Sequence, residues 1–201
     1  EILTIVHSEP NINKTDKLAL ENAIDATERA GKYLDGIKSN LTESDNLKIC
    51  TISEEIDSVL DLLSYRIRKN NIKILQNTKH DYTWHGKSLY IQQIFSNIIS
   101  NSIDAFEKNN LNKDNTIIIT QYDLNNNHYI AIENNGPEIP ENIIHKIFDP
   151  FFTTKDRDRG LGIGLSIVKS IVEERLYGKI TVENNYKNKK TWVCFTILLP
   201  L

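Results

Sequence analysis

Methionine is absent from this 201-residue chain, which also has only two cysteines, eight glycines and five prolines. Cys50 and Cys194 lie far apart in the sequence, which is typical of a reducing compartment and predicts no disulfide framework; the alternative is a single bridge between them. With 39% hydrophobic and 25% charged residues, the composition excludes a disordered or low-complexity chain. Because even position 1 is not methionine, we expect the chain to be a fragment of a longer protein.

Neither a strong charge excess nor a long apolar run occurs. The formal net charge is -3, which excludes the strongly basic surface that is typical of nucleic-acid binding. The longest apolar runs fall far short of the roughly 20 residues that span a bilayer, and no signal peptide opens the chain. We therefore expect a cytoplasmic protein without a nucleic-acid partner.

A seven-residue repeat between residues 17 and 41 predicts a dimerising helix of about three heptads. Its seam positions are Leu20, Thr27, Leu34 and Leu41, with Ala23, Ala30 and Ile37 between them. Small side chains on this helix would let a partner helix approach closely. The alternative is a helix that packs on its own domain. The polar residues 42–47 read as a linker that separates a helical segment, residues 1–41, from the remaining chain, residues 48–201.

Helical and strand patterns are interleaved in the larger segment. Alternating or apolar runs predict strands at 48–52, 72–75, 116–122, 128–133, 179–183 and 191–199. Helical spacing predicts helices over 53–69, 88–106 and 166–176, the first with Ser53 as its N-cap. Hairpins dominate the strand order, so the expected fold is an α/β two-layer sandwich with a mixed β-sheet covered by helices on one face.

Polar residues share one face of the predicted helix 88–106. Gln93, Asn97, Asn101 and Asp104 are spaced by four, four and three residues, opposite the apolar stripe. Asparagine is a poorer helix former than Lys or Glu, the usual residues of a solvated face. A carboxamide oxygen suits Mg²⁺ that is held mainly by nucleotide phosphates. The alternative is that asparagine is simply abundant in this chain.

Three alternating glycines, Gly160, Gly162 and Gly164, lead directly into the helix predicted at 166–176. They allow a sharp turn and close approach of a ligand, and the backbone N–H groups that follow favour a phosphate. Neither a dinucleotide fingerprint nor a P-loop is present.

Residues 134–137 form a second tight turn. Residues 148–152 contain three phenylalanines, which either anchor a lid on the body of the domain or belong to the core.

The order of these segments resembles the catalytic ATP-binding domain of sensor histidine kinases, part of the ATPase superfamily shared with gyrase and MutL. The family's N box resembles residues 93–105, its G1 box residues 134–139, its F box residues 148–155 and its G2 box residues 160–165. The resemblance covers residues 48–201 and implies a Bergerat-type ATP-binding fold. Residues 1–41 resemble the second half of the family's dimerisation and phosphotransfer hairpin.

Carried over onto this sequence, the resemblance implies roles for single residues. Asn101 is the implied Mg²⁺ ligand, and Asn97 and Lys155 are the implied catalytic residues near the phosphates. Asn134 stands where the family usually has an aspartate that accepts a hydrogen bond from the adenine amino group, and Gly136 lets the base approach. The other implied nucleotide contacts are Asp104, Ile139, Phe152, Thr153, Thr154, Gly160, Leu161, Gly162, Ile163, Gly164 and Leu165. The charged segment 149–160 is expected to be a mobile lid that Lys155 orders on the γ-phosphate.

Two positions depart from the family pattern. Asn134 keeps a carbonyl acceptor but loses the charge of the usual aspartate, and its amide, turned over, could instead donate to a guanine carbonyl. Glu138 replaces the second glycine of the G1 box and is expected to restrict the loop. Related hydrolases carry a glutamate one helical turn before the Mg²⁺ asparagine, where this chain has Asn97. The resemblance therefore implies slow ATP hydrolysis.

The implied function is transfer of the ATP γ-phosphoryl group to a histidine and then to a response regulator. His7 is too close to Pro10 to be the acceptor, which is expected upstream of residue 1. The other histidines are scattered without metal-ligand spacing, so core or surface roles are expected for them.

The implied assembly is a homodimer through the N-terminal helices, in a protein that is either cytoplasmic or the cytoplasmic part of a membrane-bound sensor. Two alternatives stay open: a catalytically degenerate nucleotide-binding or dimerisation module, and an ATP hydrolase or serine kinase of the same superfamily.

Overall fold

The computed structural model describes residues 48–108, 114–155, 161–187 and 189–201. The chain divides into two units, Glu1–Asp45 with Lys155–Arg159 and Asn46–Thr154 with Gly160–Leu201. Every helix and strand in the described ranges belongs to the second unit. The predicted dimerising helix at 17–41, the linker at 42–47 and His7 lie outside the described residues, as does the 156–160 part of the predicted lid, and they remain predictions.

A mixed five-stranded sheet runs through this unit in the order β2-β4-β5-β7-β6. Its strands are β2 (Lys73–Thr78), β4 (Thr116–Leu124), β5 (Asn127–Asn134), β6 (Lys179–Lys187) and β7 (Lys190–Pro200). Strand β2 pairs parallel with β4, and all other pairs are antiparallel. Asn125 and Asn126 close the β4–β5 hairpin with positive φ values of 51° and 63°, as a tight two-residue turn requires.

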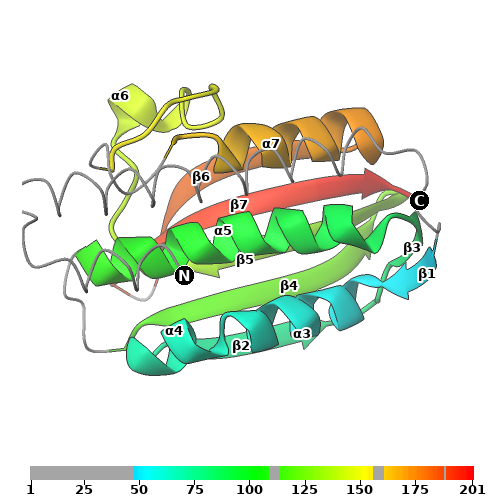
Figure 1. Cartoon of the computed structure of the whole chain (residues 1–201), viewed down its shortest axis with the longest axis horizontal. Coiled ribbons are helices and arrows are strands. Elements are labelled where there is room, and N and C mark those ends of the chain that lie inside the picture. The colour runs from blue at the N-terminus through cyan, green and yellow to red at the C-terminus, as the bar shows by residue number, and fades with distance from the viewer. Residues whose placement is uncertain (1–47, 109–113, 156–160, 188) are drawn as a thin grey trace, which may run out of the picture. The chain divides into compact units, whose positions relative to one another are not determined.

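Helices cover one face of the sheet (Figure 1). They are α3 (Ile52–Leu62), α4 (Ser64–Lys69), α5 (Ser88–Lys108) and α7 (Gly164–Ser170), which continues as a π-helix, η1 (Ile171–Arg175). The short helix α6 (Glu141–Ile144) follows β5, and a two-stranded sheet forms from β1 (Lys48–Thr51) and β3 (Thr83–Gly86). The predicted two-layer sandwich is confirmed. Within the described ranges, no helix has both the length and the apolar composition that a membrane crossing needs.

The core lies between the central strands and the apolar stripe of α5. Alternate residues of β4 and β5 are buried, such as Ile117, Ile119, Ile130 and Ile132, which is the two-residue period of a strand with one covered face. The stripe predicted on α5 is confirmed: Ile91, Ile94, Phe95, Ile98 and Ser102 are buried, and Ala105 is half-buried. This burial places the opposite, polar face of α5 away from the sheet.

The predicted start of the first helix was wrong. The N-cap of α3 is Thr51, because its hydroxyl accepts from the Glu54 N–H at 3.3 Å while the Glu54 carboxylate accepts from the Thr51 N–H at 3.2 Å. This capping box joins β1 to α3 without a loop. The N–H of Ser53 donates instead to Asp81 Oδ1 at 3.1 Å. The helix predicted over 53–69 is also interrupted, at Leu63.

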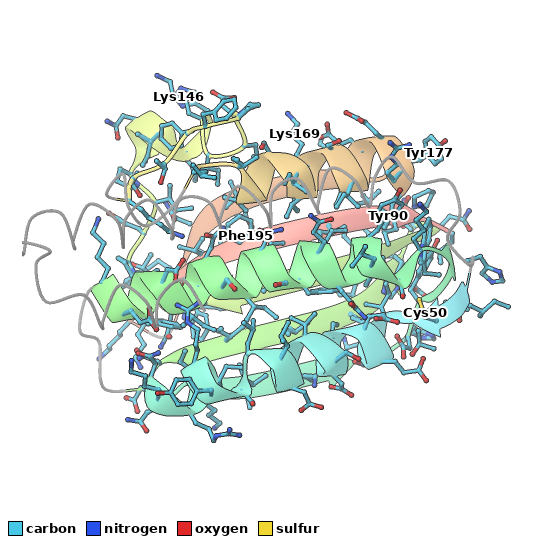
Figure 2. All side chains as sticks on the ribbon, in the orientation of Figure 1. Cys50, Tyr90, Lys146, Lys169, Tyr177 and Phe195 are labelled. Atoms are coloured by element: carbon cyan, nitrogen blue, oxygen red, sulfur yellow. The ribbon has the colours of Figure 1, made fainter. Side chains whose placement is uncertain are left out.

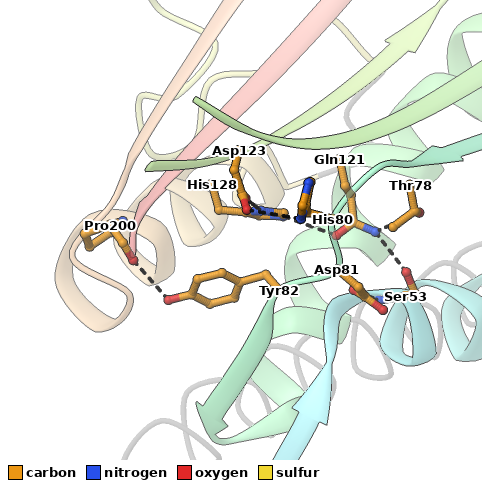
Figure 3. A network of polar contacts seen from close by, with 9 residues as sticks. All are labelled: Ser53, Thr78, His80, Asp81, Tyr82, Gln121, Asp123, His128 and Pro200. Carbon is orange, nitrogen blue, oxygen red and sulfur yellow. Dashed lines mark hydrogen bonds and ion pairs between the residues drawn. The ribbon is translucent and has the colours of Figure 1, made fainter. Parts of the chain in front are cut away.

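Figure 3 shows a polar network that connects residues near the β4–β5 turn with α3 and β2. The buried His128 ring lies with Nδ1 2.6 Å from Asp123 Oδ1 and Nε2 3.3 Å from Gln121 Oε1. The Gln121 amide donates to Ser53 Oγ at 3.0 Å and to Thr78 Oγ1 at 3.3 Å. His128 therefore has a structural role, as expected for the scattered histidines.

Strand β3, which no local pattern predicted, depends on contacts from distant parts of the chain. It pairs antiparallel with β1. The preceding Tyr82 donates its hydroxyl to the Pro200 carbonyl at 3.1 Å, and its ring lies 5.1 Å from the His128 ring. Burial raises the pKa of Tyr82. Because these partners come from the other end of the chain, short-range sequence signals could not reveal them.

The His128→Ala substitution should lower the free energy of unfolding by about 2–4 kcal/mol, because it opens a buried cavity and leaves the Gln121 oxygen without its partner. Urea unfolding followed by circular dichroism measures this. The matched control is His85→Ala at an exposed position, which should change the value by no more than about 0.5 kcal/mol. Equal effects of the two substitutions would show that the network does not stabilise the fold.

Both cysteines are free and buried, so the expected absence of a disulfide framework is confirmed. Burial, with the nearby Glu55 carboxylate, raises the pKa of Cys50 to about 11. Burial also raises the pKa of Cys194. At neutral pH both side chains are therefore thiols, not the nucleophilic thiolates.

Candidate functional site

The first turn of α7 lies directly against the polar face of α5. A Cβ atom added to Gly164 would lie 2.6 Å from Asn97 Oδ1, so only glycine fits this position without movement. The Asn97 amide donates to the Gln93 carbonyl at 2.8 Å, which leaves its oxygen on the side of Gly164. The predicted N and G2 boxes are thus in contact through Asn97.

The G2 turn also lies against the F box. Gly162 has a φ of +68°, and a Cβ atom there would lie 2.5 Å from the Phe152 carbonyl oxygen and 2.6 Å from the Phe151 carbonyl carbon. Both the backbone conformation and the close approach therefore require glycine. This contact brings residues ten positions apart in sequence together beside the start of α7 (Figure 1).

The three phenylalanines of the F box have different environments. Phe148 packs edge-on against Phe195, with ring centroids 6.5 Å apart. Phe195 lies on β7 (Figure 2). Phe152 is half-buried and packs against the core. Phe151 is 70% exposed and has a φ of +65°. Two of the three side chains therefore anchor this segment, while Phe151 forms the turn.

The G1 turn at the end of β5 holds a buried carboxamide. Asn134 is 4% exposed; its Oδ1 accepts from the Gly136 N–H at 3.1 Å, and its Nδ2 donates to Ser102 Oγ at 3.2 Å. A Cβ atom at Gly136 would lie 2.8 Å from Asn134 Oδ1 and 3.5 Å from a ring carbon of Phe106. Only glycine therefore fits beside the carboxamide oxygen without movement of a neighbour.

Two asparagines hold the G1 loop: Asn135, which lies in the predicted G1 box, and Asn184, which sequence reasoning missed. Asn184 of β6 makes both possible hydrogen bonds to the backbone of Ile139, at 3.0 and 2.7 Å. Asn135 accepts from the Thr116 N–H at 2.7 Å and donates to the Asp114 carbonyl at 2.7 Å. An asparagine such as Asn184 inside a strand has low β-propensity, and this was the one signal that could have indicated its role.

Asp104, predicted to contact the nucleotide, is engaged by a residue that the sequence did not indicate. Arg66 of α4 places Nη2 2.6 Å from Asp104 Oδ1 and 2.8 Å from Glu107 Oε2. Burial lowers the pKa of Arg66, but hydrogen bonds and charges from Glu107 and Asp104 outweigh it and hold the pKa above its usual value. The ion pair fixes the Asp104 carboxylate from the α4 side.

The remaining predicted residues lie in the F and G2 segments, and two of them cannot be placed with the others. Thr153 and Thr154 are exposed, and the Lys108 ammonium donates to the Thr154 carbonyl at 3.4 Å, which ties the end of α5 to the F box. The G2 side chains differ: Leu161 is exposed, Ile163 is half-buried and Leu165 packs against the core. The exceptions are Lys155, which belongs to the other unit, and Gly160, which lies outside the described residues.

The chemistry of this region is that of neutral amides and backbone groups. Asn97 and Asn101 are half-buried on the polar face of α5. No group of three or more His, Cys, Asp or Glu side chains that could hold a metal ion occurs in the part of the chain that the structure describes. A cation here would have to take most of its ligands from a bound anion and water, which is how Mg²⁺ binds with nucleotide phosphates.

Comparison with known proteins identifies the family. Residues 86–201 match the family described as histidine kinase-, DNA gyrase B- and HSP90-like ATPases. The sensor protein FixL of Bradyrhizobium diazoefficiens is 25% identical over 96% of this chain and 37% of its own length. The sensor histidine kinase GlnK of Bacillus subtilis is 34% identical over 55% of this chain and 26% of its own length. The chain thus spans well under half the length of these curated relatives.

Comparison with solved structures indicates the same family. The nucleotide-free catalytic domain of the histidine kinase ThkA superposes with a TM-score of 0.65 and 34% identity, covering 78% of this chain and 96% of that domain. The histidine kinase ShkA, at 17% identity and a TM-score of 0.66 over 94% of this chain, shares the fold. The resemblance carried by the four sequence segments is confirmed: the chain belongs to the family of histidine kinase-, DNA gyrase B- and HSP90-like ATPases, and its relatives are sensor histidine kinases.

Proposed function

We propose that this chain is the ATP-binding catalytic domain of a two-component sensor histidine kinase. The protein that contains it would transfer the γ-phosphoryl group of ATP to a histidine upstream of residue 1 and from there to a response regulator. The observation that carries the proposal is that the four segments meet around α5, which contains the N box. The G2 turn approaches Asn97, the G1 turn contacts Ser102 and Phe106, and the F box lies against the G2 turn at Gly162.

Each end of the proposed site has its own residues. At the base end, Asn134 Oδ1 would accept from the adenine amino group beside Gly136. At the phosphate end, Asn97 and the G2 backbone would contact the phosphates, and Asn101 would supply a neutral oxygen to Mg²⁺. Magnesium would there neutralise part of the phosphate charge. The residues of the chain fit such a ligand without a cluster of carboxylates. Lys155 belongs to the other unit, and its implied role stays a prediction.

The proposed reaction breaks the bond from the γ-phosphorus to the bridging oxygen and forms a phosphorus–nitrogen bond on histidine, with ADP as the leaving group. A neutral histidine nitrogen already carries a lone pair, so the domain needs no general base. Asn97 cannot take a proton at neutral pH. The domain would therefore act by positioning and electrostatic stabilisation.

A relative supports the proposed partner. The structure of ThkA in complex with the response regulator TrrA is similar to this chain, with 26% identity and a TM-score of 0.63 over 98% of this chain and 57% of that one. We therefore extend the proposal to a receiver domain as the phosphoryl acceptor. Homodimerisation through residues 17–41 is part of the same proposal. The location would be cytoplasmic, either as a free protein or as the cytoplasmic part of a membrane-bound sensor.

The second candidate, a degenerate module without catalysis, rests on Asn134 and Glu138. Glu138 is exposed and is not among the residues with positive φ. Glutamate therefore adopts this backbone conformation without strain. The expectation that Glu138 restricts the loop relative to glycine stays a prediction, beside the lost charge at Asn134.

Calorimetric titration of residues 1–201 with ATP, in MgCl₂ and in EDTA, tests the proposal. We expect saturable binding that is strengthened by Mg²⁺. A protein that stays folded, as judged by circular dichroism, and binds no ATP at millimolar concentrations would contradict the proposal.

The Gly162→Ala substitution should weaken ATP binding by at least about tenfold, because a Cβ atom in this conformation is strained and meets the F-box backbone. The same titration measures it. Lys169→Ala, at an exposed position on α7 (Figure 2), is the matched control and should bind as the wild type does. Unchanged affinity and thermal stability in Gly162→Ala would show that the G2–F contact does not shape the site.

A further inference from the structure

The G1 loop, residues 135–140 between β5 and α6, meets a side chain from the edge strand β6. Asn184 Oδ1 accepts from the Ile139 N–H at 3.0 Å, and Asn184 Nδ2 donates to the Ile139 carbonyl at 2.7 Å. A backbone N–H can only donate and a carbonyl can only accept, so a single orientation of the carboxamide satisfies both bonds. Asn184 therefore pairs with Ile139 as a residue of a neighbouring antiparallel strand would.

Another asparagine holds the start of the loop from the same row of the sheet. Asn134 of β5 and Asn184 of β6 both pair with Val193 of β7, the strand that lies between them. With strands about 4.8 Å apart, the two asparagines are separated by roughly 10 Å. Asn134 accepts from the Gly136 N–H at 3.1 Å. The loop is thus fastened to two different strands, at Gly136 and at Ile139.

The two bonds from Asn184 limit the conformations of the loop. A loop that is fixed at its start alone samples many conformations, and a ligand that orders it has to offset that entropy. Ile139 packs against the core, and the resemblance places it among the residues that contact the nucleotide. Asn184 therefore acts against conformations in which Ile139 leaves the candidate site.

We propose that Asn184 is a positioning residue for nucleotide binding, which keeps the G1 loop in its binding conformation before the nucleotide arrives. This inference rests on the proposed nucleotide-binding function. The apparent affinity of a site falls in proportion to the fraction of molecules in which the site is formed. Loss of the two hydrogen bonds lowers that fraction, although Asn184 itself touches only the loop backbone.

Calorimetric titration with ATP in MgCl₂ gives the first test. Asn184→Ala should weaken binding by about 5- to 30-fold, because both bonds to Ile139 are lost. Asn184→Asp is nearly isosteric but turns an oxygen towards the Ile139 carbonyl, so it should weaken binding by at least about fivefold. The matched control is Asn185→Ala. Asn185 is the next residue of β6 and donates to Glu183 at 3.0 Å, and its side chain points to the other face of the sheet. The control should bind ATP within about twofold of the wild type.

Hydrogen exchange without nucleotide separates positioning from a general effect on stability. The Ile139 amide of the wild type should exchange at least about tenfold more slowly than that of Asn184→Ala. The amides of Ile117 and Ile119 in the core strand β4 should exchange equally in both proteins. A merely structural role of Asn184 would speed the exchange of all three amides together and would leave the ATP affinity of the folded protein unchanged.

Each result decides the inference. If Asn184→Ala folds and binds ATP within about twofold of the wild type, the inference is wrong while the proposed function stands. The same holds if the wild-type Ile139 amide becomes protected only when ATP is added, a result that needs no variant to fold. If the folded wild-type chain binds no ATP, the proposed function is wrong, and the inference falls with it.

Discussion

Replacing Asn101 by alanine should weaken ATP binding in the presence of Mg²⁺ by roughly 5- to 150-fold, the equivalent of about 1–3 kcal/mol. The reason is that Asn101 offers one neutral oxygen from the half-buried polar face of α5, and alanine offers none. In EDTA the wild type and the variant should bind ATP with the same affinity. The variant should stay folded, because the apolar stripe of α5 is untouched.

Calorimetric titrations with and without Mg²⁺ measure this effect. Asn101→Asp keeps an oxygen at the same place and should keep the dependence on Mg²⁺, whereas Ser100→Ala on the same helix should behave as the wild type. Assignment of the metal to Asn101 fails if Asn101→Ala keeps the wild-type gain in affinity on addition of Mg²⁺.

Residues 1–201 should hydrolyse ATP slowly, on the order of 10²- to 10⁴-fold below a superfamily hydrolase with glutamate at the position of Asn97, which is the usual contribution of a general base. Asn97 donates to the Gln93 carbonyl and lies against Gly164, and an amide cannot take a proton from water. Asp104 is acidic but is held by Arg66 at 2.6 Å. Neither residue can therefore activate water.

Phosphate release under saturating ATP and Mg²⁺ measures the turnover. Misfolded protein would also show low turnover. The same sample should therefore bind ATP in a parallel titration, which shows that the site is intact. Rapid steady turnover by this chain would place it among the ATP hydrolases, the alternative that the sequence left open.

The sequence predicted the elements that depend on local patterns. The stripe of α5 follows the 3.6-residue period, and the β4–β5 hairpin follows from two apolar runs around an Asn-rich turn. Strand β3 was missed because it depends on pairing with β1, about which local propensity contains no information. The Thr51 cap was missed although the spacing of Thr51 and Glu54 is the local signature of a capping box.

The candidate site, too, was predictable where it depends on local motifs and not where it depends on distant contacts. The four segments were visible as motifs, and the resemblance gave roles to Asn134 and the glycines. The contacts of Ser102 with Asn134 and of Asn184 with Ile139 were not predicted, because the partners are 32 and 45 residues apart in the sequence. The orientation of the Asn134 amide, too, could be argued only once the Gly136 N–H was known to face it.

The most direct test of the central claim, that this domain donates the γ-phosphoryl group of ATP to a histidine, is labelling of the longer protein that contains it with γ-³²P-ATP and Mg²⁺. The account predicts protein-bound label that is lost in acid and stable in base, as a phosphohistidine is, and that is strongly reduced in Asn101→Ala at ATP concentrations that do not saturate the variant. Label that survives acid, or label that is unaffected by Asn101→Ala, would contradict it.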